Sequence, residues 1–313
     1  MNWDADRIPD QSGRTVVVTG ANSGLGFEAS RALAAADAHV VLACRSTDRG
    51  RDAASRVREE TPDASLELLE LDLADLASIR SFAERFERRH DDLDVLVNNA
   101  GIMAIPRRET EDGFEMQFGV NHLGHFALTG LLLDSVLAAD DPRVVTVSSG
   151  VHTRGKMRFG DLHGEVEYDE WGAYAQSKLA NLLFAYELQR RFEASDADAL
   201  SVAAHPGYAA TNLQGRAPEM QGSRLRGLLM NLANRLFAQS AEQGVLPTLY
   251  AATAPDVVGG AYYGPDGFME MRGGPERVES SERSHDQDAA RRLWEYSENA
   301  TGVTYSLPVP TRA

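Results

Sequence analysis

Short runs of apolar, mostly β-branched residues alternate with helical segments along the chain, and this alternation constrains the fold more than any other feature. Strands buried on both faces have such continuous apolar runs, and helical connections between them indicate a parallel sheet covered on both sides. We therefore predict an α/β fold with a doubly wound parallel sheet. The predicted strands lie at 15–19, 39–44, 65–71, 93–99, 143–149 and within "ALSVAAHPG" at 199–207.

The chain shows no linker rich in proline, glycine or serine, so we predict a single domain over 14–313 after a short tail at 1–13. One long helix is expected at 121–138. Two segments fall outside the alternation. The first, 208–239, contains the amphipathic pattern "RLRGLLMNLANRLF", and the second, 264–313, is a C-terminal extension that ends in a helix near "DAARRLWEYSE".

The composition limits which binding partners and which cellular compartment are expected. A formal net charge of −16 over 313 residues argues against nucleic acid, because phosphate binding needs a basic surface. No apolar run approaches the roughly 20 residues that span a bilayer, so a membrane partner is not expected. The polar N-terminus lacks the apolar core of a signal peptide, which predicts a cytoplasmic protein. A single cysteine, Cys44, excludes an internal disulfide and a cysteine-based metal cluster.

The basic residues are unusual, because Lys156 and Lys178 are the two lysines among 31 basic residues. An excess of acids with few lysines fits a cytoplasm of molar salt, where screening removes the repulsion between like charges. A GC-rich genome would favour arginine over lysine without any such adaptation. The sequence leaves both explanations open.

The segment "TGANSGLG" at 19–26 follows the first predicted strand and opens the first helix. The spacing of Gly20, Gly24 and Gly26 lets the backbone approach a pyrophosphate at a helix N-terminus, where N–H groups and the helix dipole favour anions. A glycine-rich loop alone could be a tight turn. Its position between a strand and a helix is the one that dinucleotide binding requires, so we expect a Rossmann-type nucleotide site.

The end of the second predicted strand bears on which dinucleotide binds. Folds that prefer NAD usually place an acidic residue there, to bind the ribose 2′-hydroxyl. This strand ends in Cys44 and is followed by Arg45, whose guanidinium could pair with a 2′-phosphate. The alternative is a surface arginine that caps the next helix. We expect NADP(H) to be preferred over NAD(H).

Further motifs follow the glycine loop in a fixed order. They are "NNAG" at 98–101, an asparagine in "GVNHLGHF", Ser149 after a strand, YxxxK at 174–178 and "HPG" at 205–207. Together the motifs resemble the short-chain dehydrogenase/reductases over residues 14 to about 263. "VLACR", "VNHLGHFALT" and "YYGPDGF" are most similar to the branch with retinol dehydrogenases and WW-domain oxidoreductases. That resemblance implies an oxidoreductase that interconverts small lipophilic alcohols and carbonyl compounds.

The resemblance also implies roles for individual residues. The implied catalytic residues are Asn121, Ser149, Tyr174 and Lys178. Asp72 matches the position that binds adenine, and 98–101 match the turn that lines the adenosine ribose. The full set expected to bind NADP(H) is Gly20, Asn22, Ser23, Gly24, Leu25, Gly26, Arg45, Asp72, Leu73, Asn98, Ala100, Gly101, Tyr174, Lys178, Pro206, Gly207 and Thr211.

Residue spacing bears on two of these assignments. Tyr174 and Lys178 are four residues apart and would share one helix face, either as neighbours on a polar surface or as an acid/base pair. In the second case the ammonium would lower the phenol pKa from about 10 toward the working range. Ser148 and Ser149 should point to opposite faces of their strand. The family pattern favours Ser149 as the residue in the site.

In the family, the lysine also holds the nicotinamide ribose and the asparagine holds a water that links the lysine to solvent. The serine hydrogen-bonds the substrate oxygen and stabilises its developing charge. The cofactor carries the hydride, so no metal is required. Several histidines lack the spacing in sequence that is typical of metal ligands, and we interpret them as ordinary residues. They are His122, His125, His152, His163 and His205.

Segment 208–239 would lie on the substrate side. Its leucine stripe fits a packed helix, a lid over an apolar substrate or a surface that enters a membrane interface. An alternative function is a nucleotide-binding regulatory protein with little turnover, although a sensor has no need of the complete catalytic set. The expected partner is a small lipophilic alcohol or carbonyl compound, and a homo-oligomer is left open.

Overall fold

The computed structural model describes residues 3–207 and 240–307. Its strands form one sheet in the order β3-β2-β1-β4-β5-β6-β7-β8. Neighbours from β3 to β7 are parallel, and β8 is antiparallel to β7. The predicted doubly wound α/β fold is confirmed. The strands are β1 (Thr15–Thr19), β2 (His39–Cys44), β3 (Leu66–Glu70), β4 (Val95–Asn98), β5 (Arg143–Val147), β6 (Leu200–Ala204), β7 (Tyr262–Pro265) and β8 (Pro275–Arg277).

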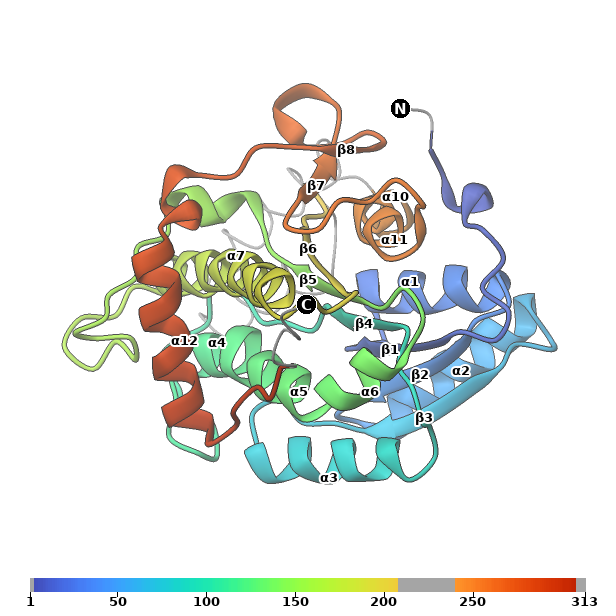
Figure 1. The fold of residues 1–313 in the computed structure, drawn as a ribbon, viewed down its shortest axis with the longest axis horizontal. Coiled ribbons are helices and arrows are strands. Elements are labelled where there is room, and N and C mark those ends of the chain that lie inside the picture. Colours follow the sequence, from blue (N-terminus) through green and yellow to red (C-terminus); the bar gives the residue numbers. More distant parts are fainter. Residues whose placement is uncertain (1–2, 208–239, 308–313) are drawn as a thin grey trace, which may run out of the picture.

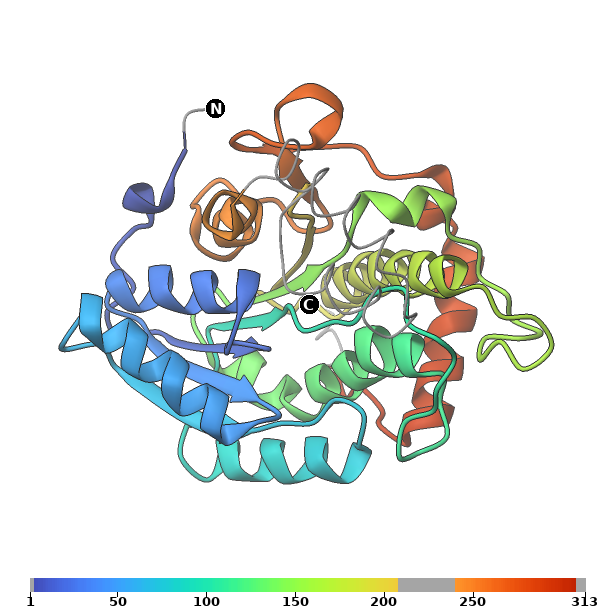
Figure 2. The same cartoon turned by 180° about the vertical axis from the view of Figure 1, so that it is seen from behind.

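Helices cover both faces of the sheet (Figures 1 and 2). One layer contains α1, α2, α10 and α11, and the other contains α3, α5, α6 and α7. In the described ranges, no helix is both long and apolar enough to cross a membrane. The helices are α1 (Gly24–Ala35), α2 (Thr47–Glu60), α3 (Leu76–Glu87), α4 (Met116–Phe118), α5 (Gly124–Leu131), α6 (Leu133–Ala138), α7 (Glu170–Ala194), α10 (Ala241–Gly244), α11 (Leu246–Thr253) and α12 (Gln287–Thr301).

Strand alternation divides the apolar residues of β1 between two cores. Val16 and Val18 pack in one cluster with Phe27 of α1, and Val17 packs in the opposite cluster with Phe82 of α3. Successive side chains of a strand point to opposite faces, so a continuous apolar run serves both layers. Burial on both faces fixes the register of the central strands and hence the loops that follow them.

Three features differ from the sequence expectations. The single long helix predicted at 121–138 is wrong, because a π-helical turn (Gly119–Leu123) precedes α5 and Leu132 separates α5 from α6 with a non-helical ψ of 5°. Strands β7 and β8 were not predicted. Within the predicted tail, the ring of Trp3 packs against Tyr250 with centroids 5.3 Å apart. Segment 208–239 lies outside the described residues.

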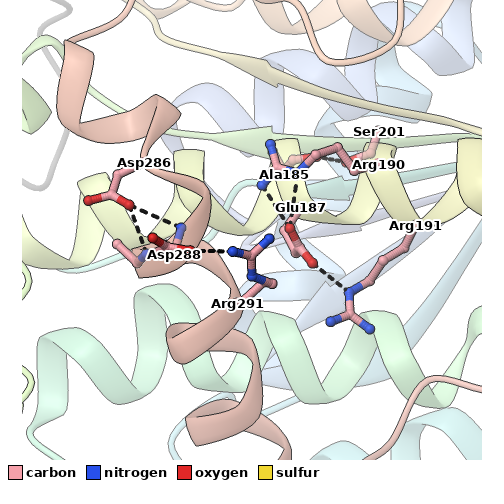
Figure 3. Close-up of polar contacts among 9 residues, drawn as sticks. Ala185, Glu187, Arg190, Arg191, Ser201, Asp286, Asp288 and Arg291 are labelled. Carbon is pink, nitrogen blue, oxygen red and sulfur yellow. Dashed lines mark hydrogen bonds and ion pairs between the residues drawn. The ribbon is translucent and has the colours of Figure 1, made fainter.

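Helix α12, in the C-terminal extension, packs across α7 (Figure 3). The Asp286 carboxylate caps its first turn by accepting two backbone N–H bonds. On α7, buried Glu187 accepts hydrogen bonds from Arg190 and Arg191. The Arg191 guanidinium also lies 4.1 Å from the ring centroid of Trp294 in α12. Helix α7 is thereby held between the sheet and α12.

Candidate active site

A cleft of about 490 Å³ lies at the carboxyl ends of the strands. Open parallel sheets bind ligands at this edge, where the loops after several strands converge. The structure brings most of the predicted cofactor residues together in its wall. These are Gly20, Asn22, Ser23, Gly24, Leu25, Gly26, Arg45, Asp72, Leu73, Ala100, Gly101, Tyr174, Lys178, Pro206 and Gly207.

Asn98 does not line this cleft, although it was expected to bind the cofactor. Its buried amide donates a 2.9 Å hydrogen bond to the Thr129 hydroxyl on α5. The next residue, Asn99, lines the cleft instead, and its side chain donates to the Thr19 carbonyl at 2.8 Å. Asn98 therefore braces β4 against α5. Thr211 lies outside the described residues.

The glycine loop leaves the N-terminus of α1 open to an anion. Ser23 is the N-cap, but its hydroxyl makes no capping hydrogen bond, so the first N–H groups of the helix have no side-chain acceptor. Gly20 has φ of +67°, a conformation that favours glycine. A Cβ on Gly26 would lie 2.5 Å from the Gly20 carbonyl oxygen. These features fit the close backbone approach of a dinucleotide pyrophosphate.

Two arginines line the end of the cleft that follows β2. The Arg45 side chain is 62% exposed, and its Nε lies 4.0 Å from a carboxylate oxygen of Asp72. Arg49, one turn into α2, also lines the cleft, and sequence analysis missed it. Cys44 points into the core, where burial raises its thiol pKa to about 12. This end of the cleft is cationic, with one carboxylate.

The two serines after β5 point in different directions. Ser149 lines the cleft with Tyr174, its side chain acts to lower the Tyr174 pKa, and its Oγ accepts from the Val151 N–H. The buried Ser148 hydroxyl donates to the Lys178 carbonyl at 2.8 Å. Both serines thus line the cleft, but the Ser148 hydroxyl is held by the backbone of α7 whereas Ser149 is the serine that influences Tyr174.

Tyr174 and Lys178 are both buried, so the interpretation as an exposed polar face is wrong. Burial raises the pKa of Tyr174 to about 12, and the nearby Ser149 side chain opposes that rise. Burial lowers the pKa of Lys178 to about 8. The predicted lowering of the tyrosine pKa by Lys178 is not found, because burial raises the pKa and Ser149 is the side chain that opposes the rise. Lys178 Nζ lies 5.9 Å from the Tyr174 ring centroid and donates to the Val147 carbonyl.

Asn121 lies fully buried in the π-helical turn beside this pair. Its Oδ1 accepts from the Ile102 N–H, and its Nδ2 donates to the Ile102 carbonyl and to the Ser177 hydroxyl. Both amide hydrogens are therefore occupied by protein groups. The side chain braces the turn after β4 rather than facing the cleft, and a water held by this amide is not supported.

The cleft wall also contains apolar residues that sequence analysis did not assign. Trp171 packs edge-on against Tyr174, with ring centroids 6.1 Å apart. The apolar run in "GIMAIP" at 101–106 was a signal that could have indicated this wall. The lining residues that sequence analysis missed here are Ile102, Met103, Ile105, Arg108, Met116, Val120, Val151 and Trp171.

A family model described as short chain dehydrogenase matches residues 14–222. Human retinol dehydrogenase 13 is 40% identical over 294 residues, which cover 93% of this chain and 85% of the relative. Mouse polyprenol dehydrogenase is 41% identical over 306 residues, which cover 95% of this chain and 86% of the relative. These similarities extend over the cleft and most of the fold.

Solved structures also match most of this chain. A crystal structure of an uncharacterized protein from Mycobacterium paratuberculosis is 42% identical and superposes with a TM-score of 0.81, covering 98% of this chain and all of that chain. A structure from Beutenbergia cavernae, described as a proposed NAD(P)-dependent gluconate 5-dehydrogenase with bound NADP, is 27% identical. Its TM-score is 0.61, and the match covers 80% of this chain and 94% of that chain.

Proposed function

Because the chain belongs to the short-chain dehydrogenase family, we propose that it is an NADP(H)-dependent oxidoreductase that interconverts an alcohol and a carbonyl compound, with Tyr174 as the acid/base. The observation that carries this proposal is that Ser149, Tyr174 and Lys178 line one cleft wall, where the Ser149 side chain acts to lower the Tyr174 pKa. The uncapped N-terminus of α1 lies in the same cleft, so a dinucleotide phosphate and a reacting oxygen have sites in one cavity.

When bound, NADPH supplies the hydride for carbonyl reduction. Tyr174 keeps its proton at neutral pH, because its pKa is raised to about 12, and can donate that proton to the substrate oxygen. The Ser149 hydroxyl can hydrogen-bond the same oxygen as negative charge develops there. Lys178, with a pKa near 8, is mostly protonated at neutral pH, and its charge stabilises the phenolate that remains. Alcohol oxidation uses the same groups in reverse.

Asn121 has a positioning role in this proposal. Its side chain fixes both backbone groups of Ile102 and also contacts Ser177, whose hydroxyl donates to the Tyr174 carbonyl. A Cβ on Gly101 would lie 3.2 Å from Asn121 Oδ1 and 3.6 Å from Lys178 Nζ. The asparagine therefore links the turn after β4 to the helix that carries the acid/base pair.

The preference for NADP(H) is supported by the cationic end of the cleft. Arg45 and Arg49 line the wall after β2, where a doubly wound fold places the adenosine ribose. Guanidinium groups pair with a 2′-phosphate by charge-assisted hydrogen bonds. Asp72 is near Arg45 and lowers the local positive charge, so Arg49 is needed for the full effect.

A lipophilic substrate is supported by the apolar residues of the cleft wall, of which Trp171 packs against Tyr174. Trp171, Met103 and Met116 present aromatic and thioether surfaces, which adapt to irregular apolar ligands. The similar proteins named retinol dehydrogenase and polyprenol dehydrogenase bear names of lipophilic alcohols. Arg108 also lines the cleft and could orient a polar end of the substrate.

A panel of carbonyl compounds and alcohols, assayed with both nicotinamide cofactors, tests the function. We expect turnover with NADPH that is highest for apolar aldehydes or ketones, and lower kcat/KM with NADH. Turnover that favours NADH would overturn the cofactor assignment alone. Tight NADPH binding without turnover across the panel would favour the regulatory alternative.

A further inference from the structure

Three metal-binding side chains converge at the opposite edge of the sheet from the cleft. His39 begins β2, Glu67 lies near the start of β3, and His90 follows α3. One potential ligand atom from each lies within 4.8 Å of the others. We propose that His39, Glu67 and His90 bind a zinc ion that ties β2, β3 and the end of α3 together.

The ligand atoms have separations close to those that zinc requires. Two atoms bound about 2.1 Å from a tetrahedral zinc lie roughly 3.4 Å apart. Glu67 Oε2 lies 2.7 Å from His90 Nε2 and 3.8 Å from His39 Nε2, so the distances fall on either side of that value. Side-chain rotations that move the ligand atoms by less than about 1 Å would bring both distances to that value.

His39 is oriented as a ligand. Its Nδ1 lies 2.7 Å from the Ser65 hydroxyl, and a hydrogen bond from Nδ1–H to Ser65 leaves the Nε2 lone pair free. Among the described residues, that Nε2 is shielded from solvent and has no hydrogen-bond partner. An orphaned acceptor of this kind costs free energy unless a cation or a donor satisfies it. Glu67, at 3.8 Å, supplies no hydrogen for it.

His90 and Glu67 already form the remaining part of the site. The His90 ring packs on Phe86 with centroids 4.7 Å apart, which restricts its rotation. Its Nε2–H donates to the carboxylate, and zinc would take the place of that proton. The three side chains are 31%, 18% and 14% exposed for His39, Glu67 and His90, so the site lies near the surface, and a water would be the fourth ligand of a bound ion.

Arg89 is the competing cation. It pairs with Oε1 of Glu67 but leaves Oε2 to the two imidazoles. The Arg89 side chain is half-exposed and flexible enough to swing into solvent. Removing its charge should therefore strengthen zinc binding, a result that a purely hydrogen-bonded cluster does not predict.

The position of the cluster assigns the ion a structural role. Arg45 and Asp72, which line the cleft, follow the carboxyl ends of β2 and β3, whereas His39 and Glu67 lie at the opposite ends of these strands. β3 is the edge strand of the sheet, and edge strands have hydrogen-bonding partners on one side alone. A zinc ion bound there would stabilise that edge without taking part in hydride transfer.

Calorimetric titration of the tag-free, chelator-treated protein with zinc chloride tests the site. We expect one equivalent to bind and to raise the melting temperature. His39→Gln and His90→Gln should each weaken binding by more than about 100-fold, and Ser65→Ala by about 10–100-fold. Arg89→Gln should tighten it. NADPH affinity should stay unchanged in every variant, which also reports that each variant is folded.

His285→Gln is the matched control, because it removes an imidazole elsewhere on the described surface and should leave zinc affinity unchanged. The proposal is overturned if the wild-type protein binds no zinc at millimolar concentration. It is also overturned if His90→Gln and His285→Gln bind zinc equally, or if zinc leaves the melting temperature unchanged.

Discussion

His125 Nε2 lies 2.9 Å from the Thr19 hydroxyl, which joins the glycine loop to the helix that follows Asn121. Its Nδ1 lies 3.1 Å from the Asn121 carbonyl, and Thr19 Oγ1 also accepts the N–H groups of Asn99 and Ala100. Burial lowers the pKa of His125 to about 4, so the imidazole is neutral. With its proton on Nδ1, every group of this network has a partner.

His125→Leu should lower both the free energy of unfolding and the affinity for NADPH. It removes the imidazole that contacts the Thr19 hydroxyl and the Asn121 carbonyl. The hydroxyl can still donate to the Val97 carbonyl at 3.3 Å, so we expect a cost of about 1–3 kcal/mol in total. The matched control is His122→Leu, because His122 is equally buried but bonds Ser297 of α12. Urea denaturation and NADPH titration should show a loss of stability in both variants and a loss of affinity in His125→Leu alone. Equal affinities would argue that the network does not position the cofactor loop.

Lys178 should give the cofactor-free protein a characteristic pH dependence. Its pKa is about 8 in the folded protein against 10.5 ordinarily, so between these values the unfolded chain retains a proton that the folded protein has released. The free energy of unfolding therefore rises with pH in this window. Relative to Lys178→Met, wild-type stability should increase by about 2 kcal/mol from pH 7 to pH 10. Urea denaturation of both proteins measures this difference, and a constant difference would contradict the lowered pKa.

Cofactor preference should depend on Arg45 and Arg49 together. Substituting leucine at both positions should reduce kcat/KM for NADPH by at least about 10-fold, because charge-assisted hydrogen bonds contribute about 1.5–3 kcal/mol. The value for NADH should change little. Adding Ser46→Asp should raise kcat/KM for NADH. Aspartate can still cap the N-terminus of α2, and its carboxylate can bind a ribose hydroxyl. An unchanged ratio for the two cofactors would exclude these arginines as the determinant.

Salt should stabilise the protein if its acidity is an adaptation. At 0.01 M salt the Debye length is about 30 Å, and at 1 M it is about 3 Å. Molar salt therefore removes most of the repulsion among the acidic side chains of a protein with a net charge of −16. We expect the melting temperature to rise strongly, and activity to persist or increase, from about 0.1 M to molar KCl. A flat melting temperature with the best activity near 0.1 M would favour codon bias as the origin of the lysine scarcity.

The sheet was predictable where local pattern and burial agree. Val16, Val17 and Val18 form an apolar run that both cores require, and such a run has few alternatives to a buried parallel strand. Strand β7 contains Gly264 and Pro265, and β8 has three residues, so neither has a strand pattern. The interruption between α5 and α6 at Leu132 could not be predicted, because the surrounding sequence is typical of a helix. Tertiary packing decides the backbone conformation at this residue.

Within the cleft, predictions failed where side-chain direction mattered. Asn98 and Asn99 are adjacent, and the pairing of β4 turns Asn98 toward α5. Arg49 lies four residues after Arg45, a spacing that could have suggested a second arginine. No local signal relates His39 to His90, because they lie 51 positions apart (90 − 39) and meet through the pairing of β2 with β3 and the end of α3.

The central claim is that Tyr174 transfers the proton in an NADP(H)-dependent oxidoreductase, and Tyr174→Phe tests it most directly. The variant keeps the ring against Trp171 and removes the hydroxyl that would transfer the proton. NADPH affinity and turnover should be measured on the same preparation with the best substrate of the panel. We predict nearly unchanged affinity and turnover lower by roughly 10²–10⁴-fold, the range for losing a general acid. Turnover equal to that of the wild type would contradict the account.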